Sequence, residues 1–145
     1  MASPRSKARQ RALEILFEAD LRGVDPRTVL ADTQARVRAQ GPEGTIPQVQ
    51  PYAATLVEGV LEHVDKIDDL LEEHSEGWAL DRMPTVDRNV LRIGVFELLW
   101  QADVPDAVVL DEAVSLARLM STDESPQFVN GLLARIAEVK DSLRR

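Results

Sequence analysis

Apolar residues recur along much of this chain at intervals of three and four, which is the spacing of one face of an α-helix. Ala8, Ala12, Ile15, Leu16 and Ala19 form the first such stripe and predict a helix over about residues 4–22. A weaker stripe predicts a second helix over about residues 26–39. The period-two alternation of a half-buried strand is absent. The pattern therefore indicates an all-α protein.

The pattern resumes at residue 52 and continues almost to the end of the chain. Through residues 52–75 it predicts one long helix or two helices with a break near Val64-Asp65. Residues 85–102 are apolar nearly all round, which is typical of a central helix buried on several sides. Two more helices are expected over about residues 107–120 and 126–143. Short loops between several of these six to seven helices favour antiparallel packing of neighbours.

Proline marks the expected helix starts, because its missing N–H has no partner in a first helical turn. Six of the eight prolines stand at such positions: Pro4, Pro26, Pro51, Pro84, Pro105 and Pro126. A serine or aspartate that can cap the helix precedes three of them. The remaining two, Pro42 and Pro47, lie in the one long loop that the sequence predicts.

Composition narrows the class of protein. The 145 residues fit a single domain over residues 1–145, with residues 1–7 expected to be a flexible basic arm. No apolar run approaches the length of a membrane span, and no apolar signal core follows the basic start. The chain has no cysteine, which excludes disulfides and thiol chemistry and fits a cytoplasmic protein.

Charge is unevenly distributed. The net charge is −8, yet the four cations of residues 1–13 have no acid among them, which leaves −12 on the other residues. Residues 61–76 alone contain seven acids and one lysine. This asymmetry is typical of an anion-binding arm on an acidic body, although a frayed basic tail on an ordinary protein would give the same pattern.

Catalytic and metal-binding motifs are missing. His63 and His74 would stand about 16 Å apart along one helix, too far to share a metal ion. No phosphate-binding glycine loop and no nucleophile motif is present. We therefore expect no enzyme activity, no metal and no cofactor.

Two stretches offer binding chemistry. Arg9, Leu13 and Phe17 form one row along the first helix, in which guanidinium groups could hold phosphate and the aromatic ring could stack on a base. The alternative is that Phe17 packs in the core and the arginines are solvated. In the run STDESPQFVNGLL, Ser125 is expected to cap the last helix and Phe128 to lie in the core or at its rim. A glycine inside a helix costs about 1 kcal/mol relative to alanine, so Gly131 suggests that another backbone approaches closely.

Three segments, KARQRALEILFEAD, VDRNVLRIGVFELLWQADVP and VVLDEAVSLARLMSTDESPQFVNGLL, together resemble the NusB family of transcription antitermination factors. The resemblance covers about residues 7–136, and only the long loop and the second helix match poorly. It implies an all-helical fold of two small packed bundles forming one compact domain, without enzymatic activity. It also implies binding to the boxA element of ribosomal RNA leader transcripts together with the ribosomal protein NusE, and loading onto elongating RNA polymerase.

The resemblance also implies a set of site residues. The RNA-binding positions carried over are Arg5, Lys7, Arg9, Phe17, Arg88, Glu124, Ser125, Gln127 and Phe128. Asp87 falls on the partner side of the family. The apolar linker residues Trp78, Leu80 and Met83, if exposed, are candidates for partner docking or for a homodimer contact. No membrane partner is expected.

Three departures from the family pattern remove contacts to RNA. Ser6 interrupts the arginines, Phe17 replaces a tyrosine, and Pro126-Gln127 stands where a basic residue is frequent. We therefore expect weak boxA binding without NusE. Two alternatives remain: a protein-only helical adaptor with an acidic face, and a NusB-like domain of the type that precedes ribosomal RNA methyltransferases.

Overall fold

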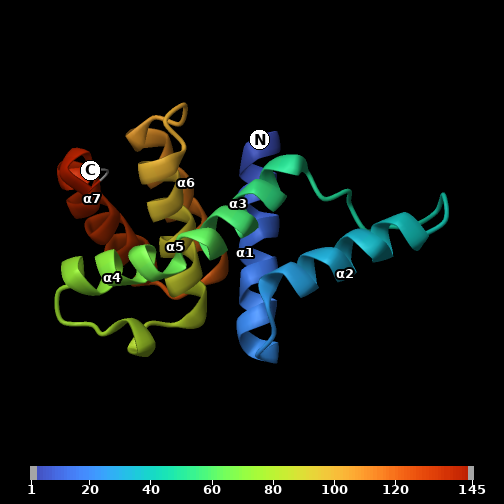
Figure 1. Ribbon diagram of the computed structural model, residues 1–145, viewed down its shortest axis with the longest axis horizontal. Helices are drawn as coiled ribbons and strands as arrows, with labels where there is room; N and C mark the ends of the chain where they lie inside the picture. The colour runs from blue at the N-terminus through green and yellow to red at the C-terminus, as the bar shows by residue number, and fades with distance from the viewer. Residues whose placement is uncertain (1–2, 144–145) are drawn as a thin grey trace. The chain divides into compact units, whose positions relative to one another are not determined.

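The computed structural model describes residues 3–143, which fold into seven α-helices and one short 3-10 helix and contain no strand. Figure 1 shows them in chain order. They are α1 (Pro4–Arg22), α2 (Pro26–Ala39), α3 (Pro51–Glu62), α4 (Val64–His74), η1 (Leu80–Arg82), α5 (Thr85–Trp100), α6 (Asp106–Met120) and α7 (Ser125–Leu143). The predicted all-α class is confirmed, and most helix ends lie within two residues of their predicted positions.

Local chemistry explains the ends of the first two helices. The Ser3 side chain accepts a hydrogen bond from the backbone N–H of Ser6, and that of Asp25 accepts one from Arg27, so each caps a helix that starts with proline. Gly23 ends α1 in the left-handed conformation at φ 68°, which a side chain would disfavour. Residues 4–7 of the predicted arm form the first turn of α1, while residues 1–2 lie outside the described part of the chain.

The predicted segment 52–75 is two helices, and the break lies at His63. This residue leaves the helical conformation with φ −113° and ψ 15°. Its ring stacks on the indole of Trp100, with 3.9 Å between ring centroids and an angle of 11° between the planes. The stacking gives His63 a packing role within the second half of the chain.

The chain divides into two compact units, residues 1–61 and residues 62–145. In the first unit, α1 packs against α2, and α1, α2 and α3 all contribute buried apolar residues. Its fully or nearly fully buried residues include Ala12, Leu13, Ile15, Leu16, Val29, Leu56, Val57 and Val60. After α2, the loop of residues 41–50 returns the chain to the start of α1, where α3 begins (Figure 1).

In the second unit, α5 is the central helix and contacts α4, α6 and α7. Eleven of its sixteen residues are buried, which confirms the prediction made from its apolar surface. Gly94 lets α5 approach α7 closely, because a Cβ placed there would lie 2.7 Å from Leu133 Cδ1. The close approach predicted at Gly131 is wrong, since a Cβ there would meet only Arg135 Nη1, at 3.5 Å.

A membrane-crossing helix is not found in residues 3–143, since none of these helices combines the necessary length and apolar character.

Candidate nucleic-acid interface

In the first unit, the start of α1 faces an aromatic ring that the sequence analysis did not single out. The Arg5 guanidinium carbon lies 4.3 Å from the centroid of the Tyr52 ring, and that of Arg9 lies 5.7 Å from it. Both distances fall within the range of a cation–π contact. Tyr52 stands in the first turn of α3, directly after Pro51. The only tyrosine of the chain, placed next to a helix-starting proline, was the signal that could have drawn attention to it.

The cations of this helix start differ in exposure. Arg5 and Lys7 are exposed, whereas Arg9 is 2% exposed. A buried guanidinium reaches a phosphate only by leaving the surroundings that it occupies in the fold. The structure therefore supports Arg5 and Lys7 as surface cations and corrects the expectation that Arg9 is a solvated side chain.

Phe17 is half-buried on α1. It is neither fully enclosed, as core packing alone would require, nor fully exposed. Its burial fits neither core packing alone nor a free ring, and its stacking on RNA stays a prediction.

In the second unit, the turn before α7 is organised around one buried carboxylate. Asp87 is 1% exposed and accepts hydrogen bonds from the hydroxyls of Ser121 and Ser125, the latter at 2.8 Å. Ser125 Oγ also accepts the backbone N–H of Thr122 at 3.3 Å and lies 2.8 Å from Thr122 Oγ1. These contacts fix the conformation of residues 121–125.

This geometry corrects the predicted capping role of Ser125. Ser125 does not precede the last helix as its cap but is its first residue, and its side chain reaches back to Thr122. Ser125 is 2% exposed and its hydroxyl bonds within the turn, so its contact with RNA stays a prediction. Asp87 is likewise buried and shapes the turn, while it also lines the depression beside Trp78 and Phe128, so its contact with a partner stays a prediction.

The turn presents Glu124, Gln127 and Phe128 toward solvent. Glu124 and Gln127 are exposed, and Phe128 is half-buried. The Phe128 ring meets that of Trp78 edge-on, with centroids 5.0 Å apart. The two rings border an open depression of about 250 Å³, whose other described lining residues include the carboxylates of Glu76 and Glu124. Of the two positions left open for Phe128, core or rim, the structure shows the rim.

The three apolar linker residues do not form a common surface. Trp78 is 42% exposed, but Leu80 and Met83 are 9% and 3% exposed. The 3-10 turn at Leu80–Arg82 brings Leu80 into the interior, and Met83 follows directly after that turn. Leu80 and Met83 therefore do not satisfy the condition of exposure on which their docking role depended. Arg88 is half-buried in the first turns of α5, and its contact with RNA stays a prediction.

The start of α1 thus bears exposed cations, and the turn before α7 bears the half-buried ring of Phe128 beside the exposed Trp78. Comparisons with known proteins identify the family. The NusB family model matches residues 6–138, and the chain belongs to the NusB family.

Curated relatives match over nearly the whole chain. The transcription antitermination protein NusB of Streptomyces avermitilis is 56% identical over 141 residues, which are 97% of this chain and 96% of the relative. The protein of the same name from Kineococcus radiotolerans is 57% identical over 139 residues and covers 96% of each chain. The resemblance noted in the sequence is confirmed.

Solved structures of NusB proteins have the same fold as this chain. T. maritima NusB superimposes with a TM-score of 0.80 at 34% identity, covering 95% of this chain and 93% of that one. A chain in the crystal structure of the antitermination factors NusB and NusE in complex with dsRNA gives a TM-score of 0.77 at 29% identity, with 93% and 96% covered. That complex joins a protein of this fold to both an RNA and NusE.

Proposed function

We propose that this protein is a transcription antitermination factor that binds boxA-type leader RNA of ribosomal RNA operons together with NusE. The complex then joins elongating RNA polymerase and promotes transcription of these operons in the cytoplasm. The protein acts by binding and catalyses no reaction. Family membership over residues 6–138 is the observation that carries the proposal.

The structural neighbours support both partners. The NusB and NusE complex with dsRNA pairs a protein of the same fold with each of them. The surface of this chain offers matching chemistry, because Arg5 and Lys7 are exposed cations at the start of α1. Lysine and arginine supply phosphate contacts, and aromatic side chains supply stacking surfaces for unpaired bases. In the second unit, Phe128 and Trp78 are candidates for such stacking.

The net negative charge of the protein weakens its binding to RNA when NusE is absent. A net charge of −8 opposes a polyanion, and the favourable contacts are confined to a few cations. We therefore expect NusE to strengthen binding to the transcript, both by adding contacts and by joining two weak interactions into one complex.

Titration of a leader RNA that contains boxA, with a scrambled sequence as control, tests the proposal in the presence and absence of NusE. We expect a preference for boxA that grows when NusE is added. Equal binding of the two RNAs under both conditions would contradict RNA recognition and favour a protein-only adaptor. Measuring the mass in solution, alone and with NusE, shows whether a homodimer forms or is replaced by the heterodimer.

A further inference from the structure

The first unit has a second polar surface next to the start of α1. It is an open depression of about 360 Å³ between α1 and the loop of residues 41–50. Six polar residues line it: Lys7, Gln10, Arg11, Glu14, Gln48 and Gln50. Only Lys7 belongs to the RNA-binding set predicted from the family, and the loop is the part of the chain that resembles the family least.

Hydrogen bonds hold the loop that forms one side of the depression. Arg11 Nη2 donates a 2.6 Å hydrogen bond to the Pro47 carbonyl, which ties the loop to α1. The Gln40 side chain forms two bonds with Ile46, accepting its N–H at 3.0 Å and donating to its carbonyl at 2.6 Å. These bonds hold the loop backbone at Ile46 and Pro47 before any ligand arrives, which lowers the cost of ordering the loop on binding.

The chemistry of the lining suits one nucleotide. The Lys7 ammonium and the remaining donors of the Arg11 guanidinium can hold a phosphate. The amides of Gln10, Gln48 and Gln50 each offer a donor and an acceptor. A glutamine amide matches adenine in particular, because it can accept from N6 and donate to N7 at the same time.

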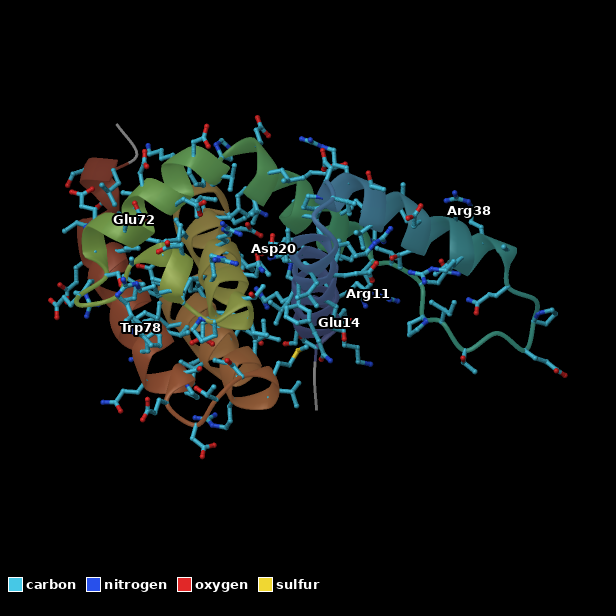
Figure 2. All side chains as sticks on the ribbon, turned by 90° about the horizontal axis from the view of Figure 1, so that it is seen from below. Arg11, Glu14, Asp20, Arg38, Glu72 and Trp78 are labelled. Atoms are coloured by element: carbon cyan, nitrogen blue, oxygen red, sulfur yellow. The ribbon has the colours of Figure 1, made fainter. Side chains whose placement is uncertain are left out.

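Glu14 is compatible with the same base. Figure 2 shows Glu14 and Arg11 on one flank of α1, on the side of the returning loop. A carboxylate repels phosphate but accepts a hydrogen bond from an exocyclic amino group, so it belongs on the base side of a bound nucleotide. Among the bases that carry an exocyclic amino group, adenine is the one that places it beside the N7 acceptor, which matches a glutamine amide.

The depression also continues the cationic surface already described. Gln50 is followed by Pro51 and Tyr52, and the Tyr52 ring carries the Arg5 guanidinium at 4.3 Å. An RNA strand that contacts Arg5 therefore has a second polar contact region nearby in the same unit.

We propose that α1 and the loop of residues 41–50 bind one unpaired adenosine of the transcript, with Lys7 and Arg11 on its phosphate and Gln48, Gln50 and Glu14 around its base. This inference rests on the proposed function and extends its RNA surface to a loop outside the family pattern.

The test is a coupling experiment with the full chain and NusE. In the leader RNA that contains boxA, each adenosine is replaced in turn by purine riboside, which lacks the amino group. For the wild type, we expect one replacement to weaken binding about fivefold or more. In a variant carrying Gln48→Ala and Gln50→Ala, the same replacement should change binding little further. Gln34→Ala on α2 is the matched control and should respond to the replacement as the wild type does.

The outcomes separate this inference from the function on which it rests. If the wild type binds the leader RNA, and every replacement has the same effect in the wild type and the double variant, this adenosine site is excluded while the proposed function stands. If the wild type does not bind the leader RNA at all, both proposals fall. Far-ultraviolet circular dichroism of the variants confirms that their helices are intact.

Discussion

At the scale of single residues, two serine hydroxyls depend on the buried carboxylate of Asp87. Replacing Asp87 with alanine removes the acceptor for both Ser121 and Ser125. Because the buried Ser125 and the half-buried Ser121 then lose this acceptor, we expect the free energy of unfolding to fall by about 1–3 kcal/mol. Urea denaturation measures the change. Asp81→Ala, at an exposed position, is the control and should change stability by less than about 0.5 kcal/mol. Equal stability of the two variants would mean that the network does not hold the turn.

Phe128 is the residue at which packing and binding can be separated. It is half-buried and meets Trp78 edge-on, so Phe128→Ala should cost less stability than removal of a core ring. Phe96 is 5% exposed, and Phe96→Ala should cost about 3–5 kcal/mol. If Phe128 stacks on a base, its loss should weaken RNA binding by about 1–3 kcal/mol while the fold is kept. Denaturation and RNA titration of both variants check this, and an unchanged RNA affinity for Phe128→Ala would remove the stacking role.

At the scale of elements, replacing two helical glycines with alanine should change stability in opposite directions. Gly94→Ala places a Cβ 2.7 Å from Leu133 Cδ1 at the contact of α5 with α7, so we expect a loss of about 1–3 kcal/mol from overpacking. Gly131→Ala meets only the flexible end of Arg135, so the higher helix propensity of alanine should raise stability by up to about 1 kcal/mol. Thermal denaturation of the pair tests the packing, and a shift of the same sign in both variants would contradict it.

The helices were the most predictable part of the fold because their signals are local. Proline after a capping residue marks the starts of α1 and α2, and the caps at Ser3 and Asp25 are formed as expected. The break at His63 was harder to predict, because a ring stacked on Trp100 from another helix accompanies it there. Helical periodicity continues through this point, so the sequence left open one long helix or two helices with a break near Val64-Asp65.

At the scale of the whole molecule, the family could be recognised from the sequence. The burial and the contacts of the individual site residues could not be predicted from it. Asp87 lies 38 residues before Ser125 and is joined to it only in the folded unit, so no local pattern indicates that both are buried. The pairing of Arg5 with Tyr52 depends in the same way on the return of the chain after the long loop. Exposure decides which side chains can meet RNA, and exposure follows from tertiary packing.

The balance of charge over the molecule yields the last prediction. With a net charge of −8, attraction to RNA depends on a few local cations, and each phosphate contact contributes about one to the slope of log affinity against log salt. Arg5 is exposed at the start of α1, so Arg5→Ala should reduce this slope by about one. Arg38→Ala removes the same charge from the exposed end of α2 (Figure 2) and should leave the slope nearly unchanged. Arg9 belongs to the RNA-binding set carried over from the family, but because it is buried we expect Arg9→Ala mainly to lower folding stability. Titrations of the leader RNA and NusE over a series of salt concentrations measure all three slopes. Equal reductions for Arg5→Ala and Arg38→Ala would show that net charge, and not contact at the start of α1, governs binding.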